Sequence, residues 1–236
     1  MTTFTFNLLR KFHNYIKKKF LTKYSGKRLL DLASGKGGDI HKWINNPKIQ
    51  YVRGYDISQE SVIEANNRLS KVSNSKNTDI KFFIKDLTMS GIVLPKIKYD
   101  IITSFFAFHY FFKNETTLAR VLTTINNSSK PGTFLLLTLF DGDKLLDLPS
   151  EYIKKHYYIT RTSLKSIIVK INETVLDKPE LEYIVTKQKL IESLITINFS
   201  LVEIVPFKDL YLDKFSLTSE EKSLSFLNNV YVFVKF

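Results

Sequence analysis

The chain of 236 residues contains no cysteine, which excludes disulfide bonds and thiolate metal sites. Its four histidines, at positions 13, 41, 109 and 156, are scattered without metal-ligand spacing, so we expect no metal. No hydrophobic run approaches the roughly 20 residues of a membrane span, and charges interrupt the apolar positions near the N-terminus. These absences indicate an intracellular protein with neither a membrane segment nor a signal peptide. No Gly-x-x-x-x-Gly-Lys-Ser/Thr loop is present, so no nucleoside-triphosphate hydrolase is indicated.

Acidic residues are also missing from positions 1–30, in a chain whose net charge is +12. The basic residues of that stretch are Arg10, Lys11, Lys17, Lys18, Lys19, Lys23, Lys27 and Arg28. Such a segment suits a polyanion, for example the phosphates of RNA. A solvated helix face would have the same composition, and the charge alone does not separate the two interpretations.

Hydrophobic periodicity predicts strands that alternate with helices. The expected strands cover residues 28–33, 51–56, 80–84, 100–105 and 132–139, and later 201–205 and 230–236. The expected helices cover residues 7–22, the stretch ending near 45, the stretch capped by Ser58, 114–128 and 187–197. This order predicts an α/β fold with a doubly wound, mostly parallel seven-stranded sheet, helices on both faces and an antiparallel last strand. The alternation of strands and helices stops in residues 141–185, and we expect these residues to form an irregular insertion over the sheet edge.

A glycine turn follows the first predicted strand, in the segment Leu30–Asp39 (LDLASGKGGD). Glycine lets the backbone approach a ligand closely, and the next helix start favours an anionic group. Asp56 ends the next strand, where a carboxylate can accept both hydroxyls of a ribose. A dinucleotide enzyme would use similar parts, but the final glycine of G-x-G-x-x-G is missing. The spacing resembles the motif of class I S-adenosylmethionine-dependent methyltransferases, and Asp86 stands where that fold places an acid for adenine.

Four stretches in order resemble the eukaryotic and viral mRNA cap guanine-N7 methyltransferases. They are Arg10–Lys17 (RKFHNYIK), Gly35–Asp39 (GKGGD) with Lys42 and Trp43, Phe106–Tyr110 (FAFHY), and Leu181–Val185 (LEYIV). The resemblance implies one methyltransferase domain over 1–236. Its parts would be a basic helix (1–27), a cofactor-binding core (28–140), an insertion near the cap site (141–185) and a segment completing the sheet (186–236).

The resemblance also implies roles for individual residues. Those that would hold S-adenosylmethionine, or the product S-adenosylhomocysteine, are Lys17, Asp31, Ala33, Gly35, Lys36, Gly37, Asp56, Ile57, Asp86, Leu87, Phe105 and Tyr110. Those near the cap guanine would be His13, Asn14, His109, Tyr110, Glu182 and Tyr231. Phe105 stands where the family has Gln, Ala33 where it has Gly, and His13 where it has Asn. Taken singly, His109, Tyr110 and Glu182 would be ordinary structural or surface residues; their joint occurrence favours the site.

The implied reaction is in-line methyl transfer to guanine N7 of a GpppN cap. The N7 lone pair is free at neutral pH, so His109, Tyr110 and Glu182 would position the base without acid–base catalysis. The alternatives are a methyltransferase for another RNA, protein or small molecule, and a non-catalytic cap- or RNA-binding subunit. The family resemblance also suggests linked RNA triphosphatase and guanylyltransferase activities and an activating subunit. The Lys-, Ile- and Asn-rich usage suggests an AT-rich genome such as that of a virus. A viral enzyme would act in the cytoplasm, in a viral factory or virion, and a cellular one in the nucleus, so both compartments stay open.

Overall fold

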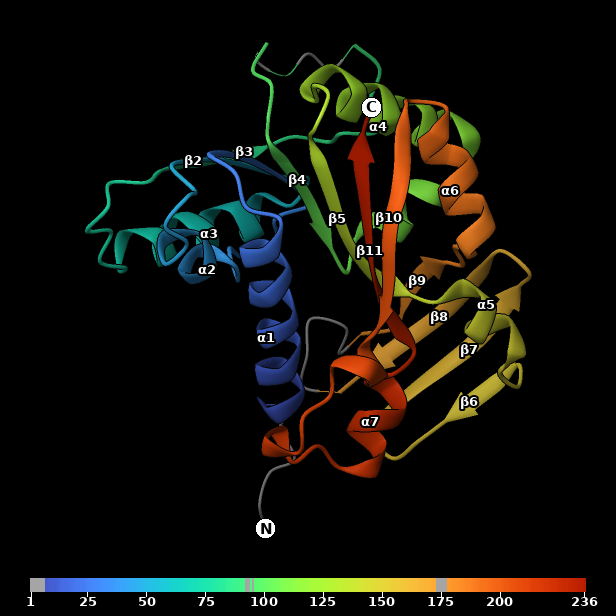
Figure 1. Cartoon of the computed structure of the whole chain (residues 1–236). Coiled ribbons are helices and arrows are strands. Elements are labelled where there is room, and N and C mark those ends of the chain that lie inside the picture. Colours follow the sequence, from blue (N-terminus) through green and yellow to red (C-terminus); the bar gives the residue numbers. More distant parts are fainter. Residues whose placement is uncertain (1–6, 92–93, 95, 173–177) are drawn as a thin grey trace.

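The computed structural model describes residues 7–91, 94, 96–172 and 178–236, and Figure 1 labels its helices and strands. Residues 1–6 of the predicted basic helix segment and 173–177 of the predicted insertion lie outside the described part. Within the described residues, no helix has both the length and the apolar character needed to cross a bilayer.

The main sheet has seven strands in the order β10-β11-β5-β4-β1-β2-β3. Their bounds are β1 (Arg28–Leu32), β2 (Tyr51–Asp56), β3 (Asp79–Ile84), β4 (Ile101–Phe105), β5 (Phe134–Phe140), β10 (Phe199–Pro206) and β11 (Asn228–Lys235). Strands β1 to β5 are parallel, and β11 runs antiparallel to both β5 and β10. The predicted doubly wound sheet with an antiparallel last strand is therefore confirmed.

Helices cover both faces of this sheet (Figure 1). They are α1 (Asn7–Lys23), α2 (Ile40–Ile44), α3 (Gln59–Ser70), α4 (Glu115–Ser128) and α6 (Lys187–Ile195). One buried apolar cluster joins α1, α2 and α3 to the sheet, and a second joins α4 and α6 to its other face. Ser58 caps α3 as predicted, because its hydroxyl accepts a hydrogen bond from the Ser61 amide.

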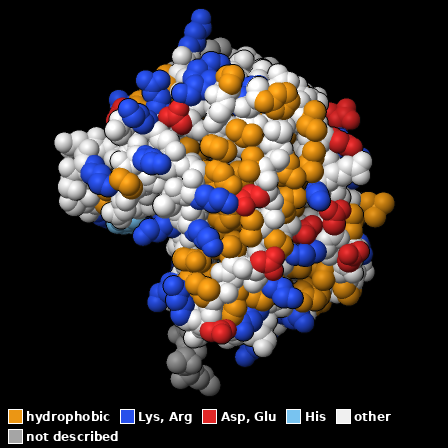
Figure 2. Space-filling view, viewed as in Figure 1, with side chains coloured by type: hydrophobic (Ala, Val, Ile, Leu, Met, Phe, Trp, Pro, Cys, Tyr) orange, Lys and Arg blue, Asp and Glu red, His pale blue; other side chains and the backbone are white. Residues whose placement is uncertain are grey.

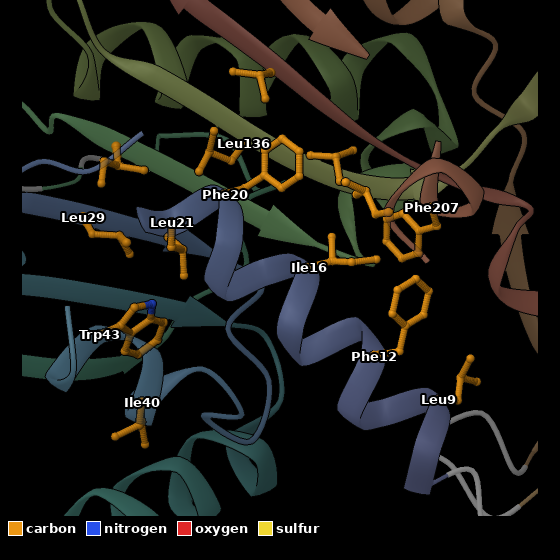
Figure 3. Close-up of a cluster of buried hydrophobic side chains, with 14 of the residues drawn as sticks. Leu9, Phe12, Ile16, Phe20, Leu21, Leu29, Ile40, Trp43, Leu136 and Phe207 are labelled. Atoms are coloured by element: carbon orange, nitrogen blue, oxygen red, sulfur yellow. The ribbon is translucent and has the colours of Figure 1, made fainter. Parts of the chain in front are cut away.

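Helix α1 is held to the body by an apolar stripe. Leu9, Phe12, Ile16 and Phe20 recur at a spacing of three or four residues, all are buried, and all point toward the sheet in Figure 3. Each such side chain contributes about 1.5–3 kcal/mol when fully buried. Phe12 also packs edge-on against Phe207, with ring centroids 6.3 Å apart, so the stripe ties α1 to the C-terminal part of the chain.

The predicted insertion follows β5, but its described residues between 141 and 185 include a second sheet, so the prediction that it is irregular is wrong. After α5 (Gly142–Asp147) come four antiparallel strands in the order β6-β7-β8-β9. Their bounds are β6 (Glu151–Ile153), β7 (Tyr157–Ser163), β8 (Ser166–Ile171) and β9 (Glu180–Tyr183). Ile159, Ile167 and Val169 are buried on the inner face, which gives these strands enough apolar contact to form.

Besides α5, four short helical elements beyond β4 were not predicted. They are η1 (Phe108–Lys113), η2 (Phe207–Leu210), η3 (Asp213–Phe215) and α7 (Ser219–Ser225). The start of α7 is fixed by a capping box, in which Thr218 and Glu221 each accept a hydrogen bond from the other's backbone amide. Among these elements, η1 and α7 carry or contact residues of the candidate site.

Candidate functional site

The carboxyl ends of the parallel strands place most of the predicted cofactor residues along one edge. Strands β1, β2, β3 and β4 end at Leu32, Asp56, Ile84 and Phe105. Because the four strands are parallel neighbours, the loops that follow them share this edge, which is where open α/β sheets bind ligands.

The loop after β1 is shaped by left-handed backbone positions. Ala33, Gly35 and Gly37 have φ values of 60°, 53° and 70°. A Cβ at Gly35 would meet no atom within 4 Å, whereas one at Gly37 would lie 3.1 Å from Ala65 on α3. Gly35 therefore presents bare backbone to open space, and Gly37 permits close packing beneath the loop. Ala33, which stands where the family has glycine, is strained at this φ.

Asp56 braces the same loop from the end of β2. Its Oδ2 accepts a hydrogen bond of 2.7 Å from the Gly35 amide, and its Oδ1 accepts one of 2.9 Å from the Ser58 amide. A carboxylate has about four acceptor sites, so each oxygen retains one for a ligand hydroxyl. Ile57, the next residue, is 67% exposed although apolar.

Asp86 follows β3 and closes a local turn. Its Oδ1 accepts hydrogen bonds from the Thr88 amide at 2.8 Å and from the Thr88 hydroxyl at 2.6 Å. Leu87 between them is buried. The turn fixes the Asp86 side chain at the shared edge, as expected of an acid that follows the third strand.

Asp31 is a buried carboxyl on β1. Among the described residues it accepts one hydrogen bond from a side chain, 2.6 Å long, from the hydroxyl of Thr103 on the neighbouring strand β4. Burial, and then the nearby charge of Asp39, raise the pKa of Asp31 to about 8. The side chain is therefore protonated at neutral pH in the free protein, and a cationic ligand group would favour its ionisation.

Lys17 reaches from α1 to Asp39, the residue that precedes α2. The Lys17 Nζ lies 2.8 Å from one carboxylate oxygen of Asp39 and 3.0 Å from the other. Lys42 Nζ lies 2.6 Å from Asp39 and donates a hydrogen bond of 2.7 Å to the Asn14 side chain. Burial alone would raise the pKa of Asp39, but the charges of Lys17 and Lys42 outweigh it and lower that pKa.

Two further predicted cofactor residues, Lys36 and Phe105, make other contacts. Lys36 is exposed, and its Nζ lies 3.6 Å from Glu60 on α3, away from the Lys17–Asp39 pair. Phe105 lies beneath Lys17, with Nζ 5.6 Å from the ring centroid, so a cation–π contact occupies the position of the family's Gln.

A second group of predicted residues meets where η1 contacts β9. His109 Nε2 lies 3.4 Å from Glu182 Oε2, and both side chains are almost fully buried. Neither ring nitrogen of His109 has a hydrogen-bond partner among the described residues. Tyr110 lies beside His109, with ring centroids 4.2 Å apart, and is 37% exposed.

Because both side chains are buried, His109 and Glu182 are both uncharged where they contact each other. Burial lowers the pKa of His109 to about 3 and raises the pKa of Glu182 to about 8, with the charge of Glu180 adding to the latter. Burial also raises the pKa of Tyr110, so its phenol stays protonated. The three side chains therefore offer uncharged polar groups, and the two buried nitrogens of His109 lack a partner among the described residues, an arrangement that buried polar groups seldom adopt without a ligand.

His13 is half-buried and stacks on Phe106, with ring centroids 5.0 Å apart and planes at 23°. Its Nε2 lies 2.9 Å from the Ser225 hydroxyl on α7. Burial, and then the charge of Lys17, lower the pKa of His13 to about 3. Phe106 itself has a φ of 58°, unusual for a bulky residue, immediately before η1. The segment 105–110 thus connects the contacts of α1 with the His109–Glu182 pair.

Tyr231, the predicted cap residue of the C-terminal segment, lies on β11. It is 1% exposed within β11, and its hydroxyl accepts a hydrogen bond of 3.2 Å from Asn229, which also donates to Asp141. Asn14, the other predicted cap residue on α1, points to Lys42 on α2. The structure brings His109, Tyr110 and Glu182 together, and the cap roles of Asn14 and Tyr231 stay predictions.

Sequence reasoning assigned no role to Asp39, Thr103 or Ser225. Asp39 belongs to the glycine loop, so its position gave a signal. Thr103 and Ser225 are brought to their partners by strand pairing and by the packing of α1 on α7, which local sequence does not reveal. No group of three or more metal-ligating side chains occurs among the residues that the structure describes.

Solved structures with a similar fold are S-adenosylmethionine-dependent methyltransferases. One from Mesorhizobium loti covers 96% of this chain and 100% of its own, with a TM-score of 0.66 and 18% identity. The glycopeptide N-methyltransferase MtfA in complex with S-adenosylmethionine covers 94% of this chain and 87% of its own, with a TM-score of 0.64 and 13% identity. At these identities the likeness establishes the fold alone.

Sequence relatives are more specific. A probable mRNA-capping enzyme of Acanthamoeba polyphaga mimivirus is 28% identical over 199 residues, which cover 72% of this chain and 17% of that protein. The mRNA cap guanine-N(7) methyltransferase of Saccharomyces cerevisiae is 31% identical over 158 residues, which cover 62% of this chain and 36% of that protein. The chain thus spans a small part of these relatives. Residues 4–162 match the family described as the mRNA (guanine-N(7))-methyltransferase domain. The chain belongs to that family.

Proposed function

We propose that the protein methylates guanine N7 of a 5′ RNA cap with S-adenosylmethionine as the methyl donor. The observation that carries the proposal is the buried His109–Glu182 pair, in which both His109 nitrogens lack a hydrogen-bond partner among the described residues. Family membership supports the same reaction, although the family match ends at residue 162, before Glu182. The role of Glu182 therefore depends on geometry.

The residues at the carboxyl ends of the parallel strands fit S-adenosylmethionine. Asp56 keeps free acceptor sites for ribose hydroxyls, and the bare backbone at Gly35 leaves room for the ligand chain. Exposed Ile57 offers an apolar surface to adenine, and Asp86 an acceptor for its amino group. Asp31 would receive the ammonium group. When bound, S-adenosylmethionine supplies a methyl group already activated by its sulfonium charge.

The three residues around Glu182 match the Watson–Crick edge of guanine. An ionised Glu182 accepts hydrogen bonds from N1–H and the exocyclic amine, and neutral His109 can donate one to O6. Tyr110, half-exposed beside His109, provides a face for stacking. Because burial keeps Glu182 protonated in the free protein, guanine binding is coupled to release of its proton, and the resulting charge stabilises the ring as it becomes cationic.

No general base is required. Guanine N7 holds a lone pair at neutral pH, so the protein must align N7 with the methyl group and exclude water. Such positioning can lower the barrier by about 7–11 kcal/mol. His109 and Tyr110 follow β4 directly and are fixed by η1, which holds the base-binding groups next to the glycine loop.

The test compares methyl transfer to GpppA-capped RNA and to uncapped RNA, with mapping of the methylated atom. We expect transfer to the capped RNA alone, at N7. Glu182→Gln should lower kcat/KM for the cap while leaving cofactor affinity unchanged, and Glu180→Gln, the same change at an exposed site on β9, is the matched control. Equal rates on both RNAs would refute the proposal, and absence of cofactor binding by calorimetry would indicate a non-catalytic cap-binding module.

Capping requires other steps before this one. The mimivirus relative is named a probable mRNA-capping enzyme, and this chain covers 17% of it. We therefore infer that RNA triphosphatase and guanylyltransferase activities, linked or separate, supply the substrate. The place of action would be the cytoplasm for a viral enzyme and the nucleus for a cellular one, with an activating subunit a further proposed partner.

A further inference from the structure

We propose that a Lys–aromatic surface at the foot of α1 binds the RNA chain that follows the cap. The surface consists of Tyr15 on α1 and of Tyr211, Lys214, Phe215 and Lys222 from the segment 207–226. The inference rests on the proposed function, because it assigns a path to the rest of the same substrate.

Lysine ammonium groups lie over aromatic rings throughout this surface. Lys214 Nζ lies 5.3 Å from the Tyr15 ring centroid and 5.5 Å from that of Phe215. Lys222 Nζ lies 4.5 Å from the Tyr211 ring centroid. Alternation of basic groups and rings is the pattern that single-stranded nucleic acids require, because lysines contact phosphates and rings stack with bases.

The rings are held in place by the core. Phe12, which is fully buried, contacts Tyr211 and Phe215 with centroid distances of 5.7 Å and 5.2 Å. Tyr15 contacts Phe215 at 5.2 Å. Since both chain segments pack on one core residue, the surface is formed before any ligand binds.

The neighbouring charges favour a polyanion. On α1, exposed Lys11 and Lys18 lie four residues before and three residues after Tyr15, so all three share one helix face. Lys208 adds a further exposed amino group, while the exposed acids of the segment 207–226 are Asp209 and Asp213. Figure 2 shows Lys and Arg side chains interleaved with apolar ones over the lower part of the molecule, where Figure 1 places the start of α1 and α7.

The surface is continuous with the base-binding site. His13 on α1 contacts Ser225 on α7 at 2.9 Å and stacks on Phe106, which leads into η1 and His109. Lys222 lies three residues before Ser225, one helical turn away. An RNA whose guanine occupies the His109–Glu182 site can therefore leave along α1 and α7 onto the Lys–aromatic surface.

The experiment distinguishes effects on cap binding from effects on binding of the RNA chain that follows the cap. The wild type and the variant Lys214→Glu/Lys222→Glu are compared on the dinucleotide GpppA and on a capped 20-nucleotide RNA. We expect kcat/KM on the capped RNA to fall about 20-fold at 0.1 M salt, and the salt slope of its binding to fall by about 1.4, the loss of two phosphate contacts. kcat/KM on GpppA should stay within twofold.

A charge-matched control is Lys71→Glu/Lys98→Glu, in which both lysines lie near the amino ends of the strands. Lys71 ends α3, and Lys98 precedes β4 and donates to the Asn127 carbonyl. An equal loss in this control, or an equal loss on GpppA, overturns the proposal. A third variant, Tyr15→Leu, should weaken RNA binding without changing the salt slope, because it removes a stacking ring and no charge.

Binding of the uncapped 20-nucleotide RNA, measured by fluorescence anisotropy, needs no methyl transfer. If the wild type methylates neither substrate but Lys214→Glu/Lys222→Glu still weakens this binding, the proposed function fails and the RNA surface stands. If the wild type methylates both substrates and the variant binds RNA normally, the RNA surface fails and the proposed function stands.

Discussion

Replacing Glu182 by Gln should change how the stability of the free protein depends on pH. Burial raises the pKa of Glu182 from its usual 4.5 to about 8. Between these values the folded protein holds a proton that the unfolded chain has lost. The stabilisation due to Glu182 is therefore complete below pH 4.5 and is lost as the pH rises through about 8.

The magnitude follows from the proton count. One proton held only by the folded state changes the free energy of unfolding by about −1.4 kcal/mol for each pH unit. Asp31, whose pKa is also raised to about 8, contributes the same slope. His13 and His109, whose pKa values fall to about 3, act in the opposite direction below about pH 7.5, and at pH 6.5 they offset about half of the acids' slope. Because the wild type and Glu182→Gln share both histidines, the difference between their slopes isolates Glu182.

Urea denaturation at pH 6.5, 7.0 and 7.5 measures this slope for the wild type, Glu182→Gln and Glu180→Gln. The wild type should lose about 2–3 kcal/mol per pH unit from the two acids together, and Glu182→Gln about half as much. Glu180→Gln, at an exposed position, should keep most of the wild-type slope, because burial is a larger cause of the raised Glu182 pKa than the charge of Glu180. An unchanged slope in Glu182→Gln would show that Glu182 is ionised and forms a true ion pair with His109, which would refute the assignment of neutral groups.

Three further changes test the fold around the site. Ala33→Gly should raise the free energy of unfolding by about 1 kcal/mol, measured by urea denaturation, because glycine tolerates the φ of 60°; a loss of stability would show that no strain is stored there. Gly142→Ala should lower it by about 2–3 kcal/mol, since the new Cβ would lie 2.3 Å from the Val185 carbonyl oxygen, whereas Gly38→Ala, with nothing within 4 Å, should be near neutral in the same assay. Asp56→Asn should weaken S-adenosylmethionine binding at least tenfold by calorimetry with little change in melting temperature; equal binding would exclude Asp56 from the ribose site.

The main sheet could be predicted from the sequence because the hydrophobic residues of each strand and helix recur with the period of that element. The second sheet could not, since its strands follow one another without helices and the expected alternation stops at Asp141. A signal was present: the β-branched runs at 157–161 and 166–171 flank a short polar turn, the pattern of a hairpin. The box formed by Thr218 and Glu221 likewise marked the start of α7.

For the site, the loop after β1 and Asp56 at the end of β2 could be predicted, because the glycine motif and the acid each stand at the end of a predicted strand. The contact of Lys17 with Asp39 was not, because it joins α1 to the glycine loop through packing of the whole helix. The strained φ of Ala33 also has no local signature, since alanine is common in relaxed backbone. Tyr231 lies in the strand expected over residues 230–236, and its role at the cap, drawn from resemblance alone, stays a prediction.

The smaller sheet contributes to only one of the two ligands of the proposed reaction. Loops of the seven-stranded sheet present the groups assigned to the methyl donor, while Glu182, assigned to the base, stands on β9 of the four-stranded one. A lineage could thus exchange the smaller sheet and acquire a new methyl acceptor while inheriting the donor machinery intact. Engineers could follow the same route by grafting an alternative hairpin between β5 and α6.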